Sequence, residues 1–167
     1  MVDPMLIISL IVLIMSFLGL SWFAGSDAPY IPTQVRKIKS LLTLAGVKKN
    51  KVFYELGSGD GRVVIEAAKL KAISFGIEQS WLRVWLSRAK ASSLNLKNAQ
   101  FFHGNIFDRN FYPADIVYIY LLQKAVDRLE KKLKKELKKG AVVITQTYHF
   151  KSWKPYKKIN QFWMYRV

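Results

Sequence analysis

Three glycines alternate with other residues between a short apolar strand and a helix, in the segment YELGSGDGRVVIEAA that begins at Tyr54. Glycine in such a strand-to-helix turn adopts backbone conformations that other residues avoid, and it lets a ligand approach the backbone closely. Free N–H groups at the start of the following helix attract a polar or anionic group. The segment therefore predicts an α/β domain whose first strand-to-helix turn binds a ligand.

The spacing of these glycines differs from that of a dinucleotide-binding turn. Gly57, Gly59 and Gly61 follow G-x-G-x-G, one residue shorter than G-x-G-x-x-G. Asp60 lies inside the turn, where a carboxylate would repel a pyrophosphate but would suit a ligand with an amino group and a positive centre. Asp60 can alternatively act only as the N-cap of the following helix, and both roles can coexist.

Two further carboxylates end predicted strands. Glu55 closes the strand KVFYEL directly before the glycine turn, and Glu78 closes the strand AISFGIE. Ligands of open α/β sheets bind outside the carboxyl ends of the strands, so we expect both side chains beside the turn. A carboxylate at Glu78 can accept hydrogen bonds from both hydroxyls of a ribose. The acids and the glycines together favour a nucleoside ligand that carries a positive charge.

Apolar strands alternate with helical segments along the rest of the chain. TQVRKIKSLLTLAG predicts a helix with Thr33 as its N-cap and Gly46 as its end. Further helices are expected in RVVIEAAKL, in SWLRVWLSRAKASSL with Ser80 as N-cap, and from Gln123 to Lys139. Further strands are expected in AQFF, ADIVYIYLL, AVVITQTY and NQFWMYRV. This alternation predicts an α/β fold with a mainly parallel sheet.

An uncharged apolar stretch of 19 residues runs from Met5 to Phe23. A helix of that length would be roughly 28 Å long, close to the thickness of a hydrocarbon core. The preceding MVDP lacks the basic residues of a signal peptide, so we expect a retained single-pass transmembrane anchor. Basic residues follow the stretch from Arg36 onward. The positive-inside rule then places the rest of the chain on the cytoplasmic side of the membrane, or on the matrix side in a mitochondrion.

The charge of the chain is concentrated after this stretch. The formal net charge of the 167 residues is +16, from 27 Lys and Arg against 11 Asp and Glu. Residues 1–33 contain two Asp and no Lys or Arg, so the remainder carries 27 − 9 = +18. Such a field favours an anionic partner, either nucleic acid, an anionic membrane surface or an acidic protein. The expected domains are an anchor over 1–23, a linker over 24–32 and a ligand-binding domain over 33–167.

Several motifs resemble one known enzyme class. YELGSGDGR resembles the first motif of class I, seven-β-strand S-adenosylmethionine-dependent methyltransferases, and FGIEQS resembles the acidic end of their second strand. PYIPTQ, LEKKLKKELKKGAVVI and YHFKSW resemble one branch, the membrane-anchored protein-lysine methyltransferases that act on the mitochondrial ATP synthase c-subunit and the adenine nucleotide translocase. The resemblance covers residues 29–167. It implies a Rossmann-like three-layer sandwich, and the few residues after 147 suggest a trimmed antiparallel edge of six strands or a small terminal hairpin.

The resemblance implies S-adenosylmethionine as the cofactor and S-adenosylhomocysteine as the product. The residues that it places around the cofactor are Glu55, Gly57, Ser58, Gly59, Asp60, Gly61, Glu78 and Asn105. Glu78 would bind the ribose and Asn105 the adenine, while Glu55, Gly57, Gly59 and Asp60 would hold the methionine part. Asn105 stands where the family more often has Asp, and an amide can still pair with adenine. Gln123 stands where the family often has Pro, so the loop after the fourth strand can differ in shape.

The resemblance also implies that the protein is an N-methyltransferase acting on a lysine of an integral membrane protein. A lysine amine must lose its proton before it attacks, and an aromatic slot lowers its pKa by desolvation. Tyr30 and Tyr120 are the candidates for this slot, with Tyr118 and Trp153 as further ones. Alternation places Tyr118 and Tyr120 on one face of their strand, so one of them can belong to the core.

Two other functions stay open on the sequence alone. A methyltransferase of this kind could act on a lipid or a small molecule. A basic membrane-tethered protein could instead bind nucleic acid without catalysis, but no aromatic-basic RNA motif or recognition helix appears, and the acidic turn would be unexplained. We therefore expect a membrane protein as partner and no nucleic acid.

Other residue patterns favour structural roles. His103 and His149 have no Cys or acidic partners at ligand spacing, so we expect no metal. Trp81 and Trp85, four residues apart on a helix, are expected to pack rather than to stack on a cofactor. The lysine-rich helix from Gln123 to Lys139 either presents a solvated face or contacts anionic lipid.

Overall fold

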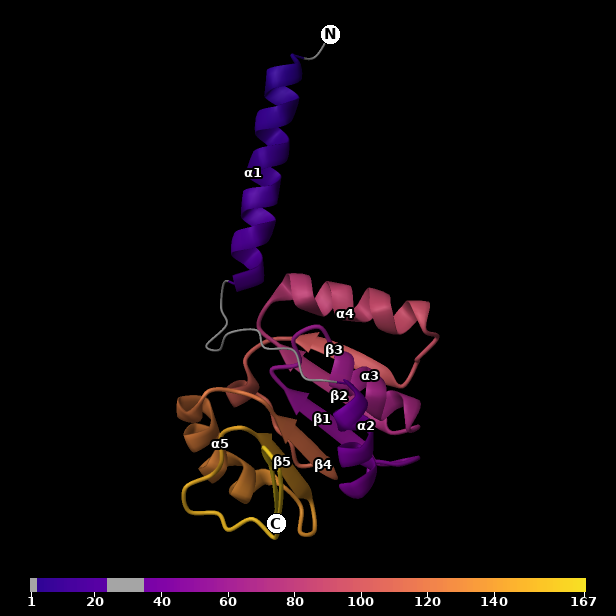
Figure 1. Ribbon diagram of the computed structural model, residues 1–167, viewed down its shortest axis with the longest axis vertical. Coiled ribbons are helices and arrows are strands. Elements are labelled where there is room, and N and C mark those ends of the chain that lie inside the picture. Colours follow the sequence, from indigo (N-terminus) through magenta and orange to yellow (C-terminus); the bar gives the residue numbers. More distant parts are fainter. Residues whose placement is uncertain (1–2, 24–34) are drawn as a thin grey trace.

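The computed structural model describes residues 3–23 and 35–167, except for the side chains of residues 18, 20–23 and 35–37 (Figure 1). Within these residues a seven-stranded sheet has the order β3-β2-β1-β4-β5-β7-β6. The parallel strands are β1 (Val52–Leu56), β2 (Ile73–Glu78), β3 (Ala99–His103), β4 (Ile116–Ile119) and β5 (Val142–Gln146). The antiparallel strands are β6 (Lys157–Ile159) and β7 (Phe162–Arg166). The predicted mainly parallel sheet with an antiparallel terminal edge is thus present.

Helices cover both faces of the sheet. The helices are α1 (Pro4–Phe23), α2 (Val35–Leu44), α3 (Arg62–Lys69), α4 (Trp81–Ser93), α5 (Gln123–Glu136) and the short 3₁₀ helix η1 (Ile106–Asp108). One core joins α2, α3 and α4 to side chains such as Phe53 and Ile144 of the sheet. A second core joins α5, through residues such as Leu129 and Leu133, to the opposite face. The predicted Rossmann-like three-layer sandwich is confirmed.

The elements depart from the expected ranges in three places. β4 uses only four residues of the apolar segment ADIVYIYLL, because the chain leaves the sheet after Ile119 and turns into α5 at Leu122. α5 ends at Glu136, where Leu137 takes an extended conformation. The C-terminal residues form the β6–β7 hairpin, so the hairpin alternative was correct and the six-stranded alternative was wrong.

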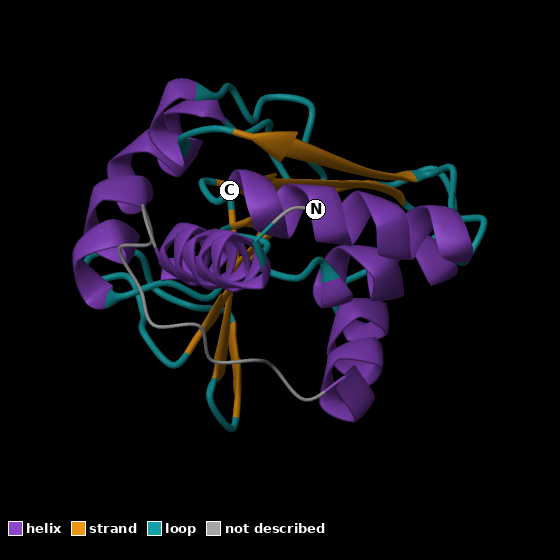
Figure 2. Cartoon of the chain, turned by 90° about the horizontal axis from the view of Figure 1, so that it is seen from above, coloured by secondary structure: helices purple, strands orange, loops and turns teal. Residues whose placement is uncertain are grey.

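The first helix stands away from the domain. Its C-terminal end lies near α4, which runs crosswise to it, and a view from above shows α1 nearly end-on (Figures 1 and 2). The apolar side chains of α1 are exposed, with Met5 at 74% and Leu13 at 68%.

The predicted transmembrane anchor is not supported. Over the described part of the chain, none of the helices has the length and apolarity that crossing a membrane requires. The single-pass localisation that rested on this anchor is likewise unsupported.

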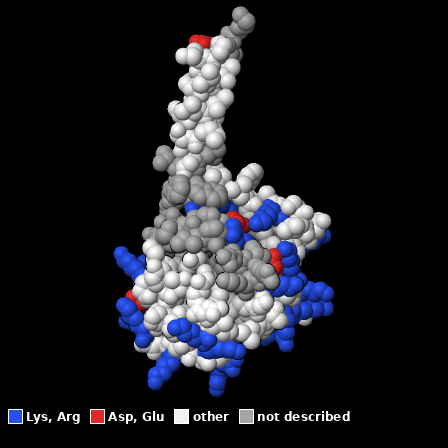
Figure 3. All heavy atoms as spheres, in the orientation of Figure 1, with Lys and Arg blue, Asp and Glu red and all other residues white. Residues whose placement is uncertain are grey.

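Lysines gather at the edge of the sheet where the parallel strands begin. The loops that precede these strands carry Lys48, Lys49, Lys51, Lys71, Lys97, Lys138 and Lys139. Asp115 lies at the same edge, and its carboxylate pairs with Lys51 at 3.1 Å and with Lys138 at 3.0 Å. On the face shown in Figure 3 the basic side chains surround the lower part of the domain, whereas the upper part of α1 is almost free of charge. This basic edge is opposite the edge that holds the glycine turn.

Candidate cofactor site

The glycine turn connects β1 to α3 in a left-handed backbone. The φ angles of Gly57, Gly59 and Gly61 are 80°, 53° and 74°, values that side-chain-bearing residues rarely adopt. The N–H groups of Gly57 and Ser58 donate to the Ile77 carbonyl at 2.9 and 3.0 Å. The turn is therefore fixed to the end of β2, as the sequence spacing predicts.

Two of the glycines also lie in close contact with neighbouring side chains. A Cβ on Gly61 would lie 2.5 Å from Cε1 of Phe101 and 2.9 Å from Cβ of Ser87, so the turn packs against β3 and α4. A Cβ on Gly57 would lie 2.7 Å from Cδ2 of Leu121, which closely follows β4. The turn thus lies where the carboxyl ends of β1, β2 and β4 meet.

Glu78 is buried at the end of β2 and is held in place by the turn. Its Oε2 accepts a hydrogen bond from the N–H of Gly59 at 2.9 Å, and its Oε1 accepts one from the N–H of Ser80 at 3.0 Å. The Nη1 atom of Arg83 lies 3.6 Å from Oε1. A carboxylate has about four lone-pair sites, so Glu78 keeps the capacity to accept ribose hydroxyls from a fixed position.

Glu55 is a buried carboxyl with acidic neighbours. It accepts a hydrogen bond from the N–H of Val64 at 3.3 Å, and no ion pair among the described residues includes it. Burial raises the pKa of Glu55 well above its usual value, and the charges of Asp60 and Glu78 raise it further. A cation beside this carboxyl would stabilise its ionised form.

Asp60 is already paired within the turn. Its carboxylate accepts hydrogen bonds from Arg62, at 2.9 Å from Nε and 2.7 Å from Nη2, and Lys90 lies 4.0 Å away. Burial acts to raise the pKa of Asp60, but the hydrogen bonds and charge of Arg62 outweigh it and lower the pKa. The N-cap of α3 is Gly61, so Asp60 does not occupy that position. Asp60 is an ionised partner of Arg62 that borders the site.

The remaining predicted cofactor residues lie around the same edge. Asn105 follows β3, is exposed, and accepts a hydrogen bond from the N–H of Phe107 at 3.0 Å through its Oδ1. Its amide nitrogen can donate to a ligand, and the second lone pair of Oδ1 can still accept a hydrogen bond. The Ser58 hydroxyl is buried and lies against Gly76 of β2, so it points into the domain.

The predicted acceptor-slot residues divide between core and surface. Tyr118 is fully buried and donates a hydrogen bond to Gln146, which gives it a structural role. Tyr120 is half-buried and packs on the same core, as the alternation requires. Trp153 stacks on Phe150, with ring centroids 5.3 Å apart, in the C-terminal part of the second core. Tyr30 lies outside the described residues, as does the predicted N-cap Thr33.

The ANTKMT methyltransferase domain family matches residues 55–157, a range that includes the glycine turn, Glu78 and Asn105. The chain belongs to this family. It is 32% identical to a protein-lysine N-methyltransferase of Saccharolobus islandicus (strain REY15A), over 79% of this chain and 84% of that protein. It is 31% identical to the ATP synthase c-subunit lysine N-methyltransferase of Rattus norvegicus, over 76% of this chain but only 59% of that protein.

Solved structures agree with the family. An RNA methyltransferase from Salinibacter ruber, in complex with S-adenosylhomocysteine, superimposes with a TM-score of 0.75 at 30% identity, over 81% of this chain and 92% of that one. A methyltransferase from Geobacter sulfurreducens, also with S-adenosylhomocysteine, has a TM-score of 0.60 at 19% identity, over 77% and 53% of the two chains, and shows the fold. The predicted class, an S-adenosylmethionine-dependent methyltransferase, is confirmed.

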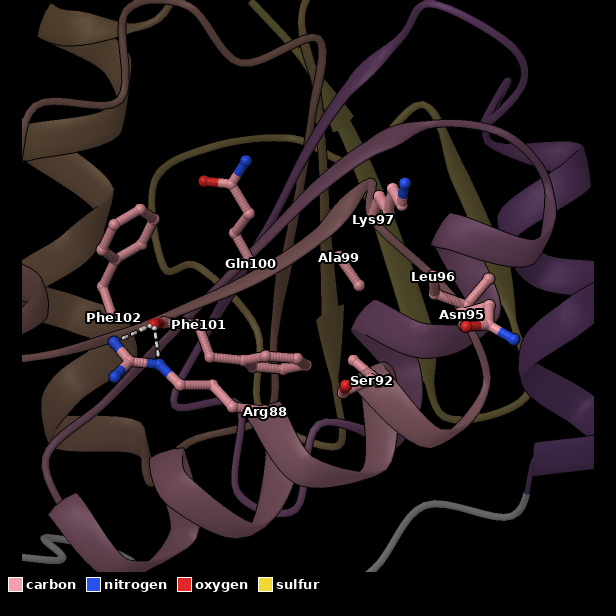
Figure 4. Close-up of a pocket in the computed structure, with 10 residues that line it drawn as sticks. Arg88, Ser92, Asn95, Leu96, Lys97, Ala99, Gln100, Phe101 and Phe102 are labelled. Atoms are coloured by element: carbon pink, nitrogen blue, oxygen red, sulfur yellow. Dashed lines mark hydrogen bonds between the residues drawn. The ribbon is translucent and has the colours of Figure 1, made fainter.

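A surface pocket of about 470 Å³ lies between α4 and the edge strand β3 (Figure 4), and its lining residue Phe101 also packs against Gly61 of the turn. Arg88 crosses it and donates two hydrogen bonds to the Phe101 carbonyl, at 3.0 Å from Nε and 2.7 Å from Nη2. None of the predicted site residues lines this pocket. The pocket is therefore separate from the carboxyl edge of the sheet, where the predicted cofactor residues lie.

Sequence reasoning missed Arg83 and did not reveal which way two tryptophans point. Arg83 is 3% exposed and reaches Glu78, and the only signal for it is that positions 83, 87 and 91 share the buried side of α4. Trp81 and Trp85, expected to pack rather than to stack on a cofactor, are 48% and 61% exposed. Their spacing does place them on one face of a helix, but that face points outward.

Proposed function

We propose that this methyltransferase transfers a methyl group from S-adenosylmethionine to a lysine side chain of an integral membrane protein. The observation that carries the cofactor half is Glu55, a buried carboxyl with acidic neighbours at the glycine turn. The lysine half is supported by the names of relatives. They include the ATP synthase c-subunit enzyme and an adenine nucleotide translocase lysine N-methyltransferase of Mus musculus, which is 26% identical over 84% of this chain and 64% of that protein.

The residues at the carboxyl edge fit the chemical groups of this cofactor. S-adenosylmethionine supplies a methyl group on a positively charged sulfur, beside an amino-acid part and a nucleoside. In our proposal Glu55 and the turn at Gly57 and Gly59, where the lack of a side chain allows close approach to the backbone, hold the amino-acid part. Glu78 accepts from the ribose, and Asn105 meets the adenine. Ser58, Asp60 and Gly61 shape the turn. The side chains of Ser58 and Asp60 contact other residues of the domain, and Gly61 leaves room for Phe101.

The remaining task of the protein is to prepare the lysine. The attacking nitrogen must lose its proton and face the methyl carbon at about 3 Å, and correct placement supplies much of the acceleration. As the nitrogen–carbon bond forms, the carbon–sulfur bond breaks with its electron pair going to sulfur, and the amine proton goes to solvent. We propose that Tyr120, half-buried after β4, lines the slot that desolvates the amine. Tyr30 remains the second candidate for this slot and lies outside the described residues.

We also propose that residues 33–167 form the methyltransferase domain and that 1–23 and 24–32 are a membrane-associated segment and its linker. A membrane location is supported by the exposed apolar side chains of α1. A substrate held in a membrane would then be reached without diffusion through the cytosol or matrix.

RNA methylation is a second candidate, because the Salinibacter ruber structure is titled an RNA methyltransferase and the chain after residue 33 has a net charge of +18. The arrangement of charge favours the lysine acceptor. The basic edge, with Lys48, Lys71 and Lys97, lies opposite the glycine turn. RNA bound at that edge would be separated from the transferred methyl group by the length of the strands.

The test is a transfer reaction with methyl-labelled S-adenosylmethionine. The full chain is incubated with isolated membranes and, separately, with total RNA, and the label is sorted into protein, lipid and nucleic acid. We expect label in membrane protein, recovered as methyl-lysine after acid hydrolysis. If the label is confined to lipid or to RNA, that molecule is the acceptor and the proposed lysine acceptor is wrong. A matched reaction with the Gly57→Val variant measures the background, because a branched side chain would collide with Leu121.

A further inference from the structure

We propose that the outer face of α4 rests on a lipid bilayer beside α1. The outer face is formed by Trp81, Leu82, Trp85, Leu86 and Ala89. The names of the relatives described above do not refer to a lipid-binding surface. The lipid contact can be measured without catalysis, so it stands or falls independently of the proposed acceptor.

α4 has one side buried against the domain and an apolar side that faces away from it. Arg83, Val84, Ser87 and Ala91 are buried against the sheet. At 3.6 residues per turn the outer face lies on the opposite side, and Trp81, Trp85 and Leu86 are 48%, 61% and 38% exposed there. A solvent-facing helix side normally carries charged residues, so this face indicates contact with an apolar partner.

The neighbouring helix α1 indicates that this apolar partner is lipid. α1 contacts α4 and runs crosswise to it (Figure 1), so the two helices present adjoining apolar surfaces. Side chains on every side of α1 are exposed, from Met5 to Phe17, and none between Pro4 and Phe17 is charged. A second protein or a second copy of this chain would cover only one side of such a helix. Lipid surrounds it on all sides and continues over the outer face of α4.

The residue types of the outer face agree with a bilayer surface. Tryptophan is enriched at membrane–water interfaces, where its ring is half in hydrocarbon and its N–H meets polar headgroups. Lys90 flanks the face with a half-exposed side chain, and a long basic side chain at such a position can extend toward phosphate groups. The lysines of the basic edge lie on another side of the domain, so the contact is predicted to be mainly apolar.

This orientation brings the methyltransferase site to the membrane. α4 begins shortly after Glu78, and the N–H of Ser80, its N-cap, donates to Glu78 at 3.0 Å. If α4 lies on the headgroups, the carboxyl edge of β2 is next to them. An acceptor lysine at headgroup level would gain a high effective concentration at the site. This consequence, unlike the lipid contact, rests on the proposed function.

The chain contains no cysteine, so a single introduced cysteine can be labelled specifically. Ala89→Cys places one nitroxide spin label on the outer face of the full chain, and Ser93→Cys provides a second position on the same side. Lys139→Cys, exposed on the basic edge, is the matched control. Each labelled protein is bound to vesicles of phosphatidylcholine and phosphatidylglycerol, and its accessibility to oxygen and to a water-soluble nickel chelate is measured.

We expect vesicle binding to raise the ratio of oxygen to nickel accessibility at residues 89 and 93 and to leave it unchanged at 139. Circular dichroism and vesicle co-flotation confirm that each labelled protein is folded and bound. If co-floating protein keeps the solution ratio at both positions on α4, the outer face is not on lipid and the inference is wrong. Dipolar coupling between labels at residue 89 of two copies would also overturn it, because a second copy would then cover the face.

Discussion

Replacing Glu55 by glutamine separates two effects of the buried carboxyl, namely its effect on the stability of the cofactor-free protein and its effect on cofactor affinity. Glu55 is 5% exposed, accepts one hydrogen bond from Val64, and has Asp60 and Glu78 as charged neighbours. Glutamine keeps the size of the side chain and an acceptor oxygen but carries no charge. The Glu55→Gln variant therefore tests the charge alone.

The sign of the stability change follows from the pKa. The pKa of Glu55 is raised in the folded protein, so its contribution to stability is full below the usual value of 4.5 and is lost as the pH rises through the folded pKa. Without cofactor, Glu55→Gln should therefore equal or exceed the wild type in free energy of unfolding at neutral pH. The advantage should grow as the pH rises from 4.5 and level off above the folded pKa.

Cofactor binding should favour the wild type over Glu55→Gln, the reverse of their order of stability without cofactor. A hydrogen bond between charged groups contributes about 1.5–3 kcal/mol, which corresponds to a roughly 10- to 150-fold weaker Kd for S-adenosylmethionine in Glu55→Gln. Urea unfolding over a pH series gives the stability, and calorimetry gives the affinity. Glu66→Gln is the control, because Glu66 is also buried but pairs with Lys69 at 2.6 Å. Unchanged cofactor affinity in Glu55→Gln, or a loss of stability at neutral pH like that of the control, would refute the role assigned to Glu55.

Three further predictions concern the turn, the C-terminal loop and the acceptor slot. Gly61→Ala should lower the free energy of unfolding in urea by about 1–3 kcal/mol, because its Cβ would collide with Phe101. The pKa of Glu130 is lowered because hydrogen bonds from Ser152 outweigh its burial, so its contribution is present above 4.5 and lost as the pH falls through the folded pKa. Glu130→Gln should cost about 1–3 kcal/mol at pH 7 and flatten the acid side of the stability profile. Tyr120→Ala should reduce kcat by about tenfold or more, equivalent to about 1.4 kcal/mol, while calorimetry shows an unchanged Kd for S-adenosylmethionine.

Features that depend on local chain geometry were predictable from the sequence. Alternating apolar strands and helices indicated the parallel sheet, because a strand buried on both faces has to be apolar throughout. The left-handed turn followed from the positions of Gly57, Gly59 and Gly61, since glycine adopts positive φ at low cost. Glu55 and Glu78 meet at one edge because the carboxyl ends of parallel strands share it.

Features that depend on which way a side chain points were not predictable. Trp81 and Trp85 have the spacing of one helix face, and that spacing is the same whether the face meets the core or an apolar phase outside. Ser58 has the place of a ligand contact in the turn, but it points toward Gly76. Arg62 neutralises Asp60 only because the turn folds back on itself at Gly61, which spacing alone does not reveal.

Mass spectrometry of membrane proteins from cells with and without this gene tests the central claim most directly. The account predicts that methylation of at least one lysine disappears without the gene, on an integral membrane protein and at the headgroup level of the face that the enzyme occupies. Wild-type protein should restore the methyl-lysine, whereas a Gly57→Val variant should not. If the only methyl-lysines that disappear belong to soluble proteins, or if no methyl-lysine changes, the proposed acceptor is contradicted.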